Sequence, residues 1–262
     1  MITCGVDIGS TTIKTALFDG DRILHSQVIK SGSRPAENAR RAFHETLTAA
    51  GIDRQSVDAV LATGYGRNYF AESDTVASEI LCHASGAAHI CPSARTVIDI
   101  GGQDSKIISL DTGGRVANFV MNDRCAAGTG KFIEMVSLML DIPLDDMGEV
   151  TAGSNEACEI SSMCAVFAES EIIGLTQSGT PADVILRGVF RSVARRILSM
   201  TGKTGLLPEV IFTGGVARNA GVLRALEQET GMSLSVAPEP QITGAVGAAI
   251  IAASRMLRSQ HV

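Results

Sequence analysis

The stretch Val6-Asp-Ile-Gly-Ser-Thr-Thr-Ile-Lys14 returns in altered form as Ile98-Asp-Ile-Gly-Gly-Gln-Asp-Ser-Lys106. Aspartate, glycine and lysine keep their places at a constant offset of 92 residues, which also pairs Asp19 with Asp111. Each copy ends an apolar run in Asp, turns through small residues and continues into two further apolar runs, a pattern typical of a three-stranded β-meander. The repeat therefore indicates an internal duplication with two related halves.

Helical periodicity follows each meander, over residues 35–50 after the first and 129–140 after the second. Further helices are predicted over 79–91, 181–200, 217–229 and 244–258, and strands over 210–213 and 234–237. This alternation predicts an α/β protein of two related lobes. We assign 1–94 plus 245–262 to the first lobe and 95–244 to the second.

Composition narrows the classes of partner. The net charge is −6, aromatic residues make up 4 % and Trp is absent, so nucleic acid is an unexpected partner. The richest apolar run, residues 245–253, is far shorter than the ~18 residues that a membrane-spanning helix needs. No Lys or Arg precedes an apolar core in the first thirteen residues, so a secretory signal is not expected. We expect a soluble cytoplasmic protein that does not bind membranes.

The cysteines give a second constraint. There are six, and none forms a CxxC pair, so a zinc ribbon or a single-chain iron–sulfur run is not predicted. A reducing compartment also argues against disulfides. Any metal site has to combine distant residues or two chains.

The duplicated turns favour phosphate binding. Backbone amides of such a turn point at phosphate oxygens, and the Asp carboxylate holds Mg²⁺, usually through retained water. One copy alone is equally consistent with an ordinary hairpin, whereas two copies suggest turns that act on one polyphosphate. The glycine pair in 210–219 lets backbone approach a flat base, and the small residues in 243–249 permit close helix contact at a hinge, or plain packing.

These segments resemble those of the superfamily of actin, the sugar kinases and the large ATP-dependent chaperones. DIGSTTIK (7–14) and DIGGQDSK (99–106) resemble its two phosphate motifs, FTGGVARN (212–219) its adenosine motif, and GAVGAA (244–249) its second connecting helix. The resemblance implies a duplicated ribonuclease H-like fold with a nucleotide cleft between two lobes. No GxxxxGK[ST] motif is present, which excludes a Walker A site.

The same resemblance implies the nucleotide-binding residues. Asp7 and Asp99 would organise Mg²⁺, and Lys14 would neutralise phosphate charge. The other implied contacts to ATP or ADP are Gly9, Ser10, Thr11, Thr12, Gly101, Gly102, Gln103, Gly214, Gly215, Val216, Asn219 and Gly244. Gln103 would orient the attacking water, as glutamines do in other nucleotide hydrolases, and Asp104 is the alternative base. Either side chain could instead cap the turn.

Two cysteines stand apart from the other four. Cys125 precedes the 129–140 helix, and Cys164 precedes an apolar pattern of helical spacing. Amide donors at a helix N-terminus favour a thiolate, the form that binds iron. The alternative reading, a small buried hydrophobe, is the expectation for Cys4, Cys82 and Cys91.

The segments NDRCAAGTGKF (122–132) and ISSMCAVFAESE (160–171) resemble the cysteine segments of the ATP-dependent activators of 2-hydroxyacyl-CoA dehydratases. The resemblance extends through ATGYGR (62–67), VIDIGGQD (97–104) and TGGVARN (213–219), and includes the ATPase subunits of benzoyl-CoA reductase. It implies a homodimer in which Cys125 and Cys164 of both chains hold one [4Fe–4S] cluster. Cys158 is treated as a non-ligand.

The resemblance further implies an anaerobic electron-transfer ATPase. A flavodoxin or ferredoxin would supply the electron, and a 2-hydroxyacyl-CoA dehydratase, a related reductase or a double-cluster protein would receive it. Two alternatives remain open at this point: a pantothenate-kinase-like small-molecule kinase using Asp74 or Asp123, and an iron–sulfur sensor. The sequence leaves the acyl-CoA substrate and the natural donor open.

Overall fold

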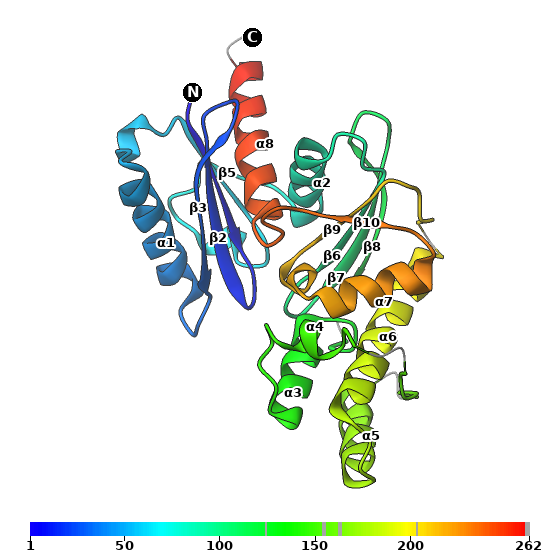
Figure 1. Ribbon diagram of the computed structural model, residues 1–262. Helices are drawn as coiled ribbons and strands as arrows, with labels where there is room; N and C mark the ends of the chain where they lie inside the picture. Colours follow the sequence, from blue (N-terminus) through cyan, green and yellow to red (C-terminus); the bar gives the residue numbers. More distant parts are fainter. Residues whose placement is uncertain (124, 154–155, 162–163, 203, 260–262) are drawn as a thin grey trace. The chain divides into compact units, whose positions relative to one another are not determined.

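The computed structural model describes residues 1–123, 125–153, 156–161, 164–202 and 204–259. Its contacts divide the chain into two compact units. Unit one comprises Met1–Val97, Leu110–Ala117 and Ala237–Val262, and unit two comprises Ile98–Ser109 and Asn118–Val236. Two five-stranded sheets are flanked by helices, which confirms the predicted α/β class (Figure 1).

The sheet of unit one has the order β3-β2-β1-β4-β5. The first three strands form the predicted antiparallel meander, and β4 runs parallel to β1. The sequence pattern does not predict β4 or β5. The elements are β1 (Thr3–Ile8), β2 (Thr12–Phe18), β3 (Ile23–Lys30), α1 (Pro35–Ala50), β4 (Ala59–Thr63), β5 (Thr75–Val76), α2 (Glu79–Ile90) and α8 (Thr243–Ser259), with 3₁₀ turns η1 (Arg54–Ser56) and η2 (Arg67–Tyr69).

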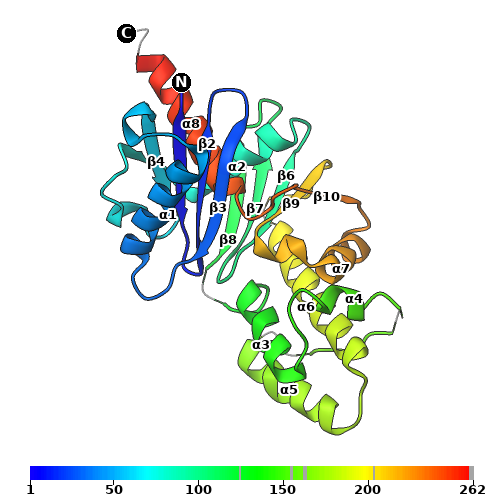
Figure 2. The same cartoon turned by 60° about the vertical axis from the view of Figure 1, so that its left-hand side comes forward.

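Strand β1 is buried along its whole length because helices cover both faces of its sheet (Figures 1 and 2). Its even-numbered residues, Cys4 among them, pack in a core with Phe43 and Leu47 of α1. Its odd-numbered residues face α8, where the Thr3 hydroxyl donates to the Ala249 carbonyl oxygen. The strand period of two thus turns the last odd residue, Asp7, toward the start of α8.

The second sheet has the order β10-β9-β6-β7-β8, and helices α6 and α7 pack against each other beside it. One large core fills unit two, including Ile98, Phe132, Phe190 and Phe212. The elements are β6 (Thr96–Ile100), β7 (Ser105–Leu110), β8 (Val116–Asn122), α3 (Gly130–Leu140), α4 (Met147–Val150), α5 (Ala165–Gln177), α6 (Ala182–Thr201), β9 (Val210–Thr213), η3 (Gly215–Arg218), α7 (Ala220–Thr230) and β10 (Leu234–Val236).

Most predicted elements lie within two residues of the observed ones. The clearest difference is the helix expected over 217–229, which is split into η3 and α7. Asn219 separates them because its side chain caps α7 from an extended backbone. Within the described residues, no helix combines the length and apolarity needed to cross a bilayer.

Helix α8 touches its neighbours in unit one through glycines. A Cβ at Gly247 would lie 1.7 Å from the Cys82 carbonyl oxygen, and one at Gly5 would lie 1.9 Å from the Ala245 carbonyl oxygen. Both distances are far inside van der Waals contact with backbone. Side chains at these positions would have to push α8 away from α2 or from β1.

Gly247→Ala is therefore expected to lower the free energy of unfolding by about 3 kcal/mol, at the upper end of overpacking costs. The measurement is urea unfolding. The matched control is Gly174→Ala in α5, where an added Cβ meets no atom within 4 Å. This control is expected to gain about 0.5–1 kcal/mol, because alanine favours a helix interior over glycine. Equal stability of the two variants would contradict the packing argument.

Candidate functional site

The first predicted phosphate turn lies at the end of β1. Asp7 is 3 % exposed, and Lys14, its cross-strand neighbour, places Nζ 3.1 Å from Asp7 Oδ2. The Gly9 amide donates to the Thr12 carbonyl at 3.0 Å and closes the turn. A Cβ at Gly244 would lie 3.2 Å from Asp7 Oδ2. The structure thus brings Asp7, Lys14 and Gly244 together within unit one.

Polar atoms at the tip of this turn suit an anionic ligand. Among the described residues, Thr11 Oγ1 is buried without a hydrogen-bond partner, and Ser10 is exposed. A buried hydroxyl without a partner is costly unless a ligand or water satisfies it. Thr12 begins β2 directly behind the tip. The turn therefore fits the phosphate-binding role that the sequence predicts for it.

The second turn repeats this geometry in unit two. The Gly101 amide donates to the Asp104 carbonyl at 2.9 Å, and Lys106 Nζ lies 3.4 Å from Asp99 Oδ2. Asp99 Oδ1 accepts a hydrogen bond of 2.8 Å from the Thr213 hydroxyl. Gly102 and Gln103 form the tip, where Gln103 is exposed. Each copy of the repeat therefore has the same type of backbone turn and its own Asp–Lys pair.

The glycine pair of the adenosine-like motif packs on the second turn. Gly214 has a φ of +88°, and a Cβ there would lie 2.3 Å from the Ile100 carbonyl oxygen. Glycine is the residue that tolerates both conditions. Val216 is buried in the core of unit two, and Asn219 Oδ1 accepts from the amides of Gly221 and Val222 as the cap of α7. The two side chains thus serve the core and the helix cap, and the adenine contact expected for this segment stays a prediction.

The cysteines separate by environment. Burial raises the pKa of the Cys4 and Cys82 thiols to about 12, and it also raises that of Cys158, whose Sγ packs on Gly188. These thiols are poor iron ligands because the thiolate is the form that binds metal. Cys164 is exposed at the N-cap of α5, and Cys125 is half-buried. The two predicted ligands thus lie in unit two, Cys164 at an exposed position and Cys125 at a half-buried one.

The loop that carries Cys125 is tied to the second phosphate turn. The amides of Gly130 and Lys131, at the start of α3, donate to the carbonyls of Gly101 and Gly102, both at 2.8 Å. Asn122 holds the other side of the loop, since its Nδ2 donates to the Cys125 carbonyl at 3.0 Å. Gly130 follows Cys125 by only five positions in the chain. Movement of the turn would therefore reach Cys125 directly.

Several residues around these turns are not predicted by the sequence. Thr213 donates a hydrogen bond to Asp99, and Asn122 donates one to the Cys125 carbonyl. Nothing in the local sequence around either residue predicts these contacts. Gly64 packs against the first turn, because a Cβ there would lie 2.4 Å from Asp7 Oδ1. The two glycines of TGYG are therefore a sequence signal for a segment that closely approaches this turn. The buried ring of His83 lies next to Asp7, since a Cβ at Gly244 would be 3.0 Å from its Nε2.

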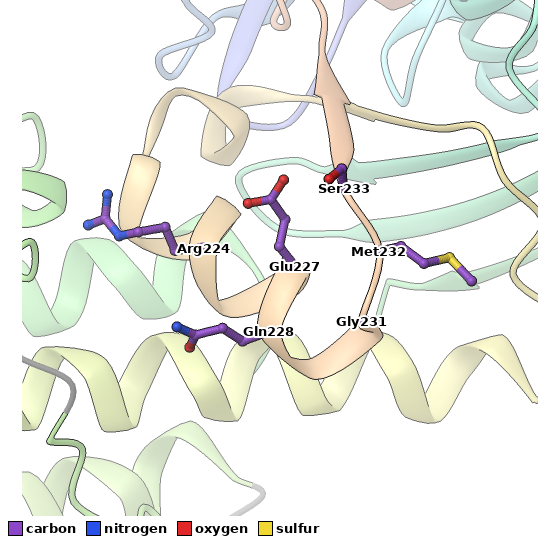
Figure 3. A pocket seen from close by; sticks show the side chains of 6 residues that line it. All are labelled: Arg224, Glu227, Gln228, Gly231, Met232 and Ser233. Atoms are coloured by element: carbon purple, nitrogen blue, oxygen red, sulfur yellow. The ribbon is translucent and has the colours of Figure 1, made fainter.

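A pocket of about 470 Å³ lies at the far end of α7 (Figure 3). It is lined by Arg224, Glu227, Gln228, Gly231, Met232 and Ser233. None of the predicted site residues lines this pocket. Glu227 serves the local fold there, because its carboxylate accepts from the Leu234 amide at 3.1 Å.

Comparison with known proteins gives one family. Residues 4–252 match the BadF/BadG/BcrA/BcrD ATPase family. The chain is 43 % identical over 253 residues to the activator of lactoyl-CoA dehydratase of Anaerotignum propionicum, covering 96 % of this chain and 97 % of the relative. It is 33 % identical to a subunit of the benzoyl-CoA reductase of Thauera aromatica, over 97 % of this chain and 94 % of that protein.

Solved structures agree with these matches. The activator of 2-hydroxyisocaproyl-CoA dehydratase from Clostridium difficile, solved with bound ADPNP, superimposes with a TM-score of 0.94 at 39 % identity, covering 100 % of this chain and 97 % of that chain. A ROK hexokinase from Thermus thermophilus gives a TM-score of 0.54 at 18 % identity, over 98 % of this chain and 100 % of that chain. The second likeness concerns the fold alone and confirms the predicted actin-like class.

Proposed function

Because this chain belongs to the BadF/BadG/BcrA/BcrD ATPase family, we propose that it couples ATP hydrolysis to delivery of a low-potential electron from a [4Fe–4S] cluster. The chain is a dehydratase-activating ATPase, related over nearly its whole length to activators of 2-hydroxyacyl-CoA dehydratases. The cluster, the dimer that holds it and the electron donor are the proposed parts. A flavodoxin or ferredoxin is the proposed donor, and a 2-hydroxyacyl-CoA dehydratase is the partner.

The nucleotide part of the proposal uses both turns. The amides and hydroxyls of Ser10–Thr12 and the Gly102 amide bind phosphate oxygens, and Gly101, whose amide closes the turn on the Asp104 carbonyl, lies against them. Asp7 and Asp99 hold Mg²⁺ through its water molecules, the mode that this ion prefers. The proposed first lobe comprises residues 1–94 plus 245–262, and the proposed second lobe comprises residues 95–244. An ATP analogue bound to the relative of known structure supports nucleotide binding by this chain.

The cluster part rests on the donor set. One chain supplies the two proposed ligands, Cys125 and Cys164, and two chains supply the four thiolates that a [4Fe–4S] cluster takes. Within the described residues of one chain, no group of three or more His, Cys, Asp or Glu side chains is arranged to hold a metal. This arrangement supports a cluster shared by two subunits. A cytoplasmic, anaerobic setting is the matching proposal for six free thiols.

The observation that carries the coupling is the pair of hydrogen bonds between Gly101–Gly102 and the start of α3. They connect the turn that contacts the nucleotide to the loop that carries Cys125. A γ-phosphate bound by the turn would shift these carbonyls, and the α3 N-terminus with them. Amide hydrogen bonds and solvent exposure around cysteine sulfur set the potential of a cluster, so such a shift changes its reducing power.

The test is an anaerobic reconstitution. Protein purified without oxygen is expected to contain about four iron atoms per dimer and to hydrolyse Mg-ATP. It is then mixed with reduced flavodoxin, a purified 2-hydroxyacyl-CoA dehydratase and its substrate. Dehydration is expected with ATP and absent with a non-hydrolysable analogue. A sample that lacks iron and activates no dehydratase would refute the proposal.

Exposed apolar side chains beside Cys164 support the proposed dimer. Val166 and Phe167, in the first turn of α5, are 68 % and 69 % exposed. Aromatic and aliphatic groups of this size are common at the centre of homodimer interfaces. The cluster ligand and the apolar patch thus occupy the same end of α5.

Phe167→Asp is expected to convert the dimer to a monomer and to remove its iron, because a charge would be buried without a partner. Light scattering after size-exclusion chromatography gives the mass, and iron analysis gives the metal content. Leu257→Asp, on the exposed side of α8 in unit one, is the matched control and is expected to remain a dimer. An iron-loaded dimer of Phe167→Asp would place the interface elsewhere.

The kinase alternative finds little support at its candidate bases. Asp74 Oδ2 accepts from the Val60 amide at 2.7 Å, so this carboxylate holds strand β4 in place. Asp123 is exposed at the end of β8, beside the Cys125 loop. Phosphorylation of a small alcohol by an iron-free sample would favour this alternative. The sensor alternative requires ATP binding without hydrolysis or electron transfer.

A further inference from the structure

The two copies of the repeat differ in what surrounds their lysines. Lys14 has an ion pair with Asp7, and its side chain is 16 % exposed. Lys106 is 2 % exposed and lies 3.4 Å from Asp99 Oδ2 and 2.7 Å from Asp104 Oδ2. The second carboxylate exists because Asp104 stands where the first copy has Thr12. The duplication has therefore given the second turn a three-charge cluster around a buried lysine, with Asp99 buried and Asp104 half-buried, that the first turn lacks.

The carboxylate of Asp104 is folded back over its own turn. Its Oδ2 meets Lys106 at 2.7 Å, and its Oδ1 would lie 2.4 Å from a Cβ at Gly101. Only glycine at 101 leaves room for this arrangement. The carboxylate thus packs on its own turn and is held there by an ion pair with the buried Lys106 ammonium.

Gln103 has the opposite environment. It stands exposed at the tip, and within the described residues no hydrogen bond holds its side chain. A carboxamide both donates and accepts, so it can orient a water toward a phosphorus atom without taking its proton. The two candidates for this role are therefore unequal in the structure.

We infer that Lys106 is a positioning residue that holds the Asp104 carboxylate against its own turn, which leaves the Gln103 carboxamide to orient the attacking water. The inference rests on the proposed ATP hydrolysis. Lys106 also anchors Asp99, whose other oxygen is bonded to Thr213 at the edge of the adenosine-like motif. One buried lysine thus sets the geometry of the second phosphate turn and its link to β9.

The test is a set of variants assayed for kcat and KM of Mg-ATP hydrolysis, with affinity for a fluorescent ADP analogue measured separately. Gln103→Ala is expected to lower kcat by about 100-fold or more, the usual contribution of such groups, with KM changed less than about threefold. Asp104→Asn, which keeps the size of the side chain, is expected to lower kcat only about two- to fivefold. The acid limb of its kcat–pH profile is expected to match that of the parent.

Lys106→Met is expected to lower kcat by about 10- to 100-fold, because it leaves two facing carboxylates without their shared cation. Adding Asp104→Asn to it removes one of the charges and is expected to restore at least about threefold, a positive coupling in the double-mutant cycle. Asp21→Asn, an exposed carboxamide variant in the β2–β3 turn, is the control and is expected to behave as the parent. Thermal unfolding reports whether each variant folds.

Two results would overturn the inference while leaving the proposed function standing. One is an Asp104→Asn enzyme as slow as Gln103→Ala, with a flattened acid limb, which would make Asp104 the base. The other is a folded double variant no faster than Lys106→Met. If Lys106→Met does not fold, the comparison of Asp104→Asn with Gln103→Ala decides. An unmodified protein that hydrolyses no ATP would instead refute the proposed function, and the inference with it.

Discussion

Cys164→Ala and Cys125→Ala are each expected to yield a colourless protein with almost no iron after anaerobic purification. Each substitution removes two of the four thiolates of a shared cluster, because it acts in both subunits. The loss is therefore larger than for a cluster with four ligands in one chain. Iron analysis measures the loss of metal, and visible absorption measures the loss of the thiolate-to-iron charge-transfer bands.

The matched controls are the other cysteines that solvent reaches. Cys91→Ala and Cys158→Ala are expected to retain iron, since Cys91 lies in unit one and Cys158 packs on α6. Electron paramagnetic resonance of the dithionite-reduced proteins, with ADP and with ATP, extends the comparison. An unchanged cluster signal in Cys125→Ala would remove this residue from the ligand set and with it the shared site.

Gly130→Pro is expected to reduce strongly the difference between the ADP and ATP spectra of the proposed cluster while the iron content is retained. Proline removes the amide that donates to the Gly101 carbonyl and places its ring carbon at that oxygen. The rest of α3 tolerates this change, because Thr129 before it is extended and proline is favoured at the first helical position. Only the hydrogen bond from the Lys131 amide to the Gly102 carbonyl would then remain, so movement of the turn would reach the Cys125 loop more weakly.

Gly130→Ala is the matched control, since it keeps the amide and adds only a Cβ 3.1 Å from the Gly101 oxygen. It is expected to retain most of the nucleotide response. ADP affinity is measured for both variants, so that loss of binding is distinguished from loss of coupling. A full spectral response in Gly130→Pro would show that the signal reaches the cluster by another route.

The fold can be predicted from the sequence where local signals agree with tertiary ones. Helix α1 begins at Pro35 and ends before Gly51, whose φ of +66° is a left-handed cap, so both ends carry their own signal. Strand β4 escapes prediction because it lies outside the repeated meander and two of its five residues are alanines. Alanine is depleted in strands, and so short a run lacks the alternation that identifies one. Its neighbour β5 has only two residues and forms only by pairing with β4.

The candidate site divides in the same way. The turn residues and the two cysteines lie in contiguous motifs, so the sequence is enough to propose them as site residues. Thr213, 114 residues from Asp99, becomes its partner only through strand order in the second sheet. From the sequence alone, Asp104 can be either the ion-pair partner of Lys106 or a catalytic carboxylate. The two interpretations differ in the direction of the Asp104 side chain, which the sequence does not give.

The buried thiols at Cys4 and Cys82 bear on how such a protein survives air. With pKa values of about 12, they stay protonated and unreactive under physiological conditions. In the folded protein, oxidants would therefore reach these two sulfur atoms only when the core of unit one opens. Oxidation of the cysteines is expected to begin at the exposed Cys164, which external reductants also reach.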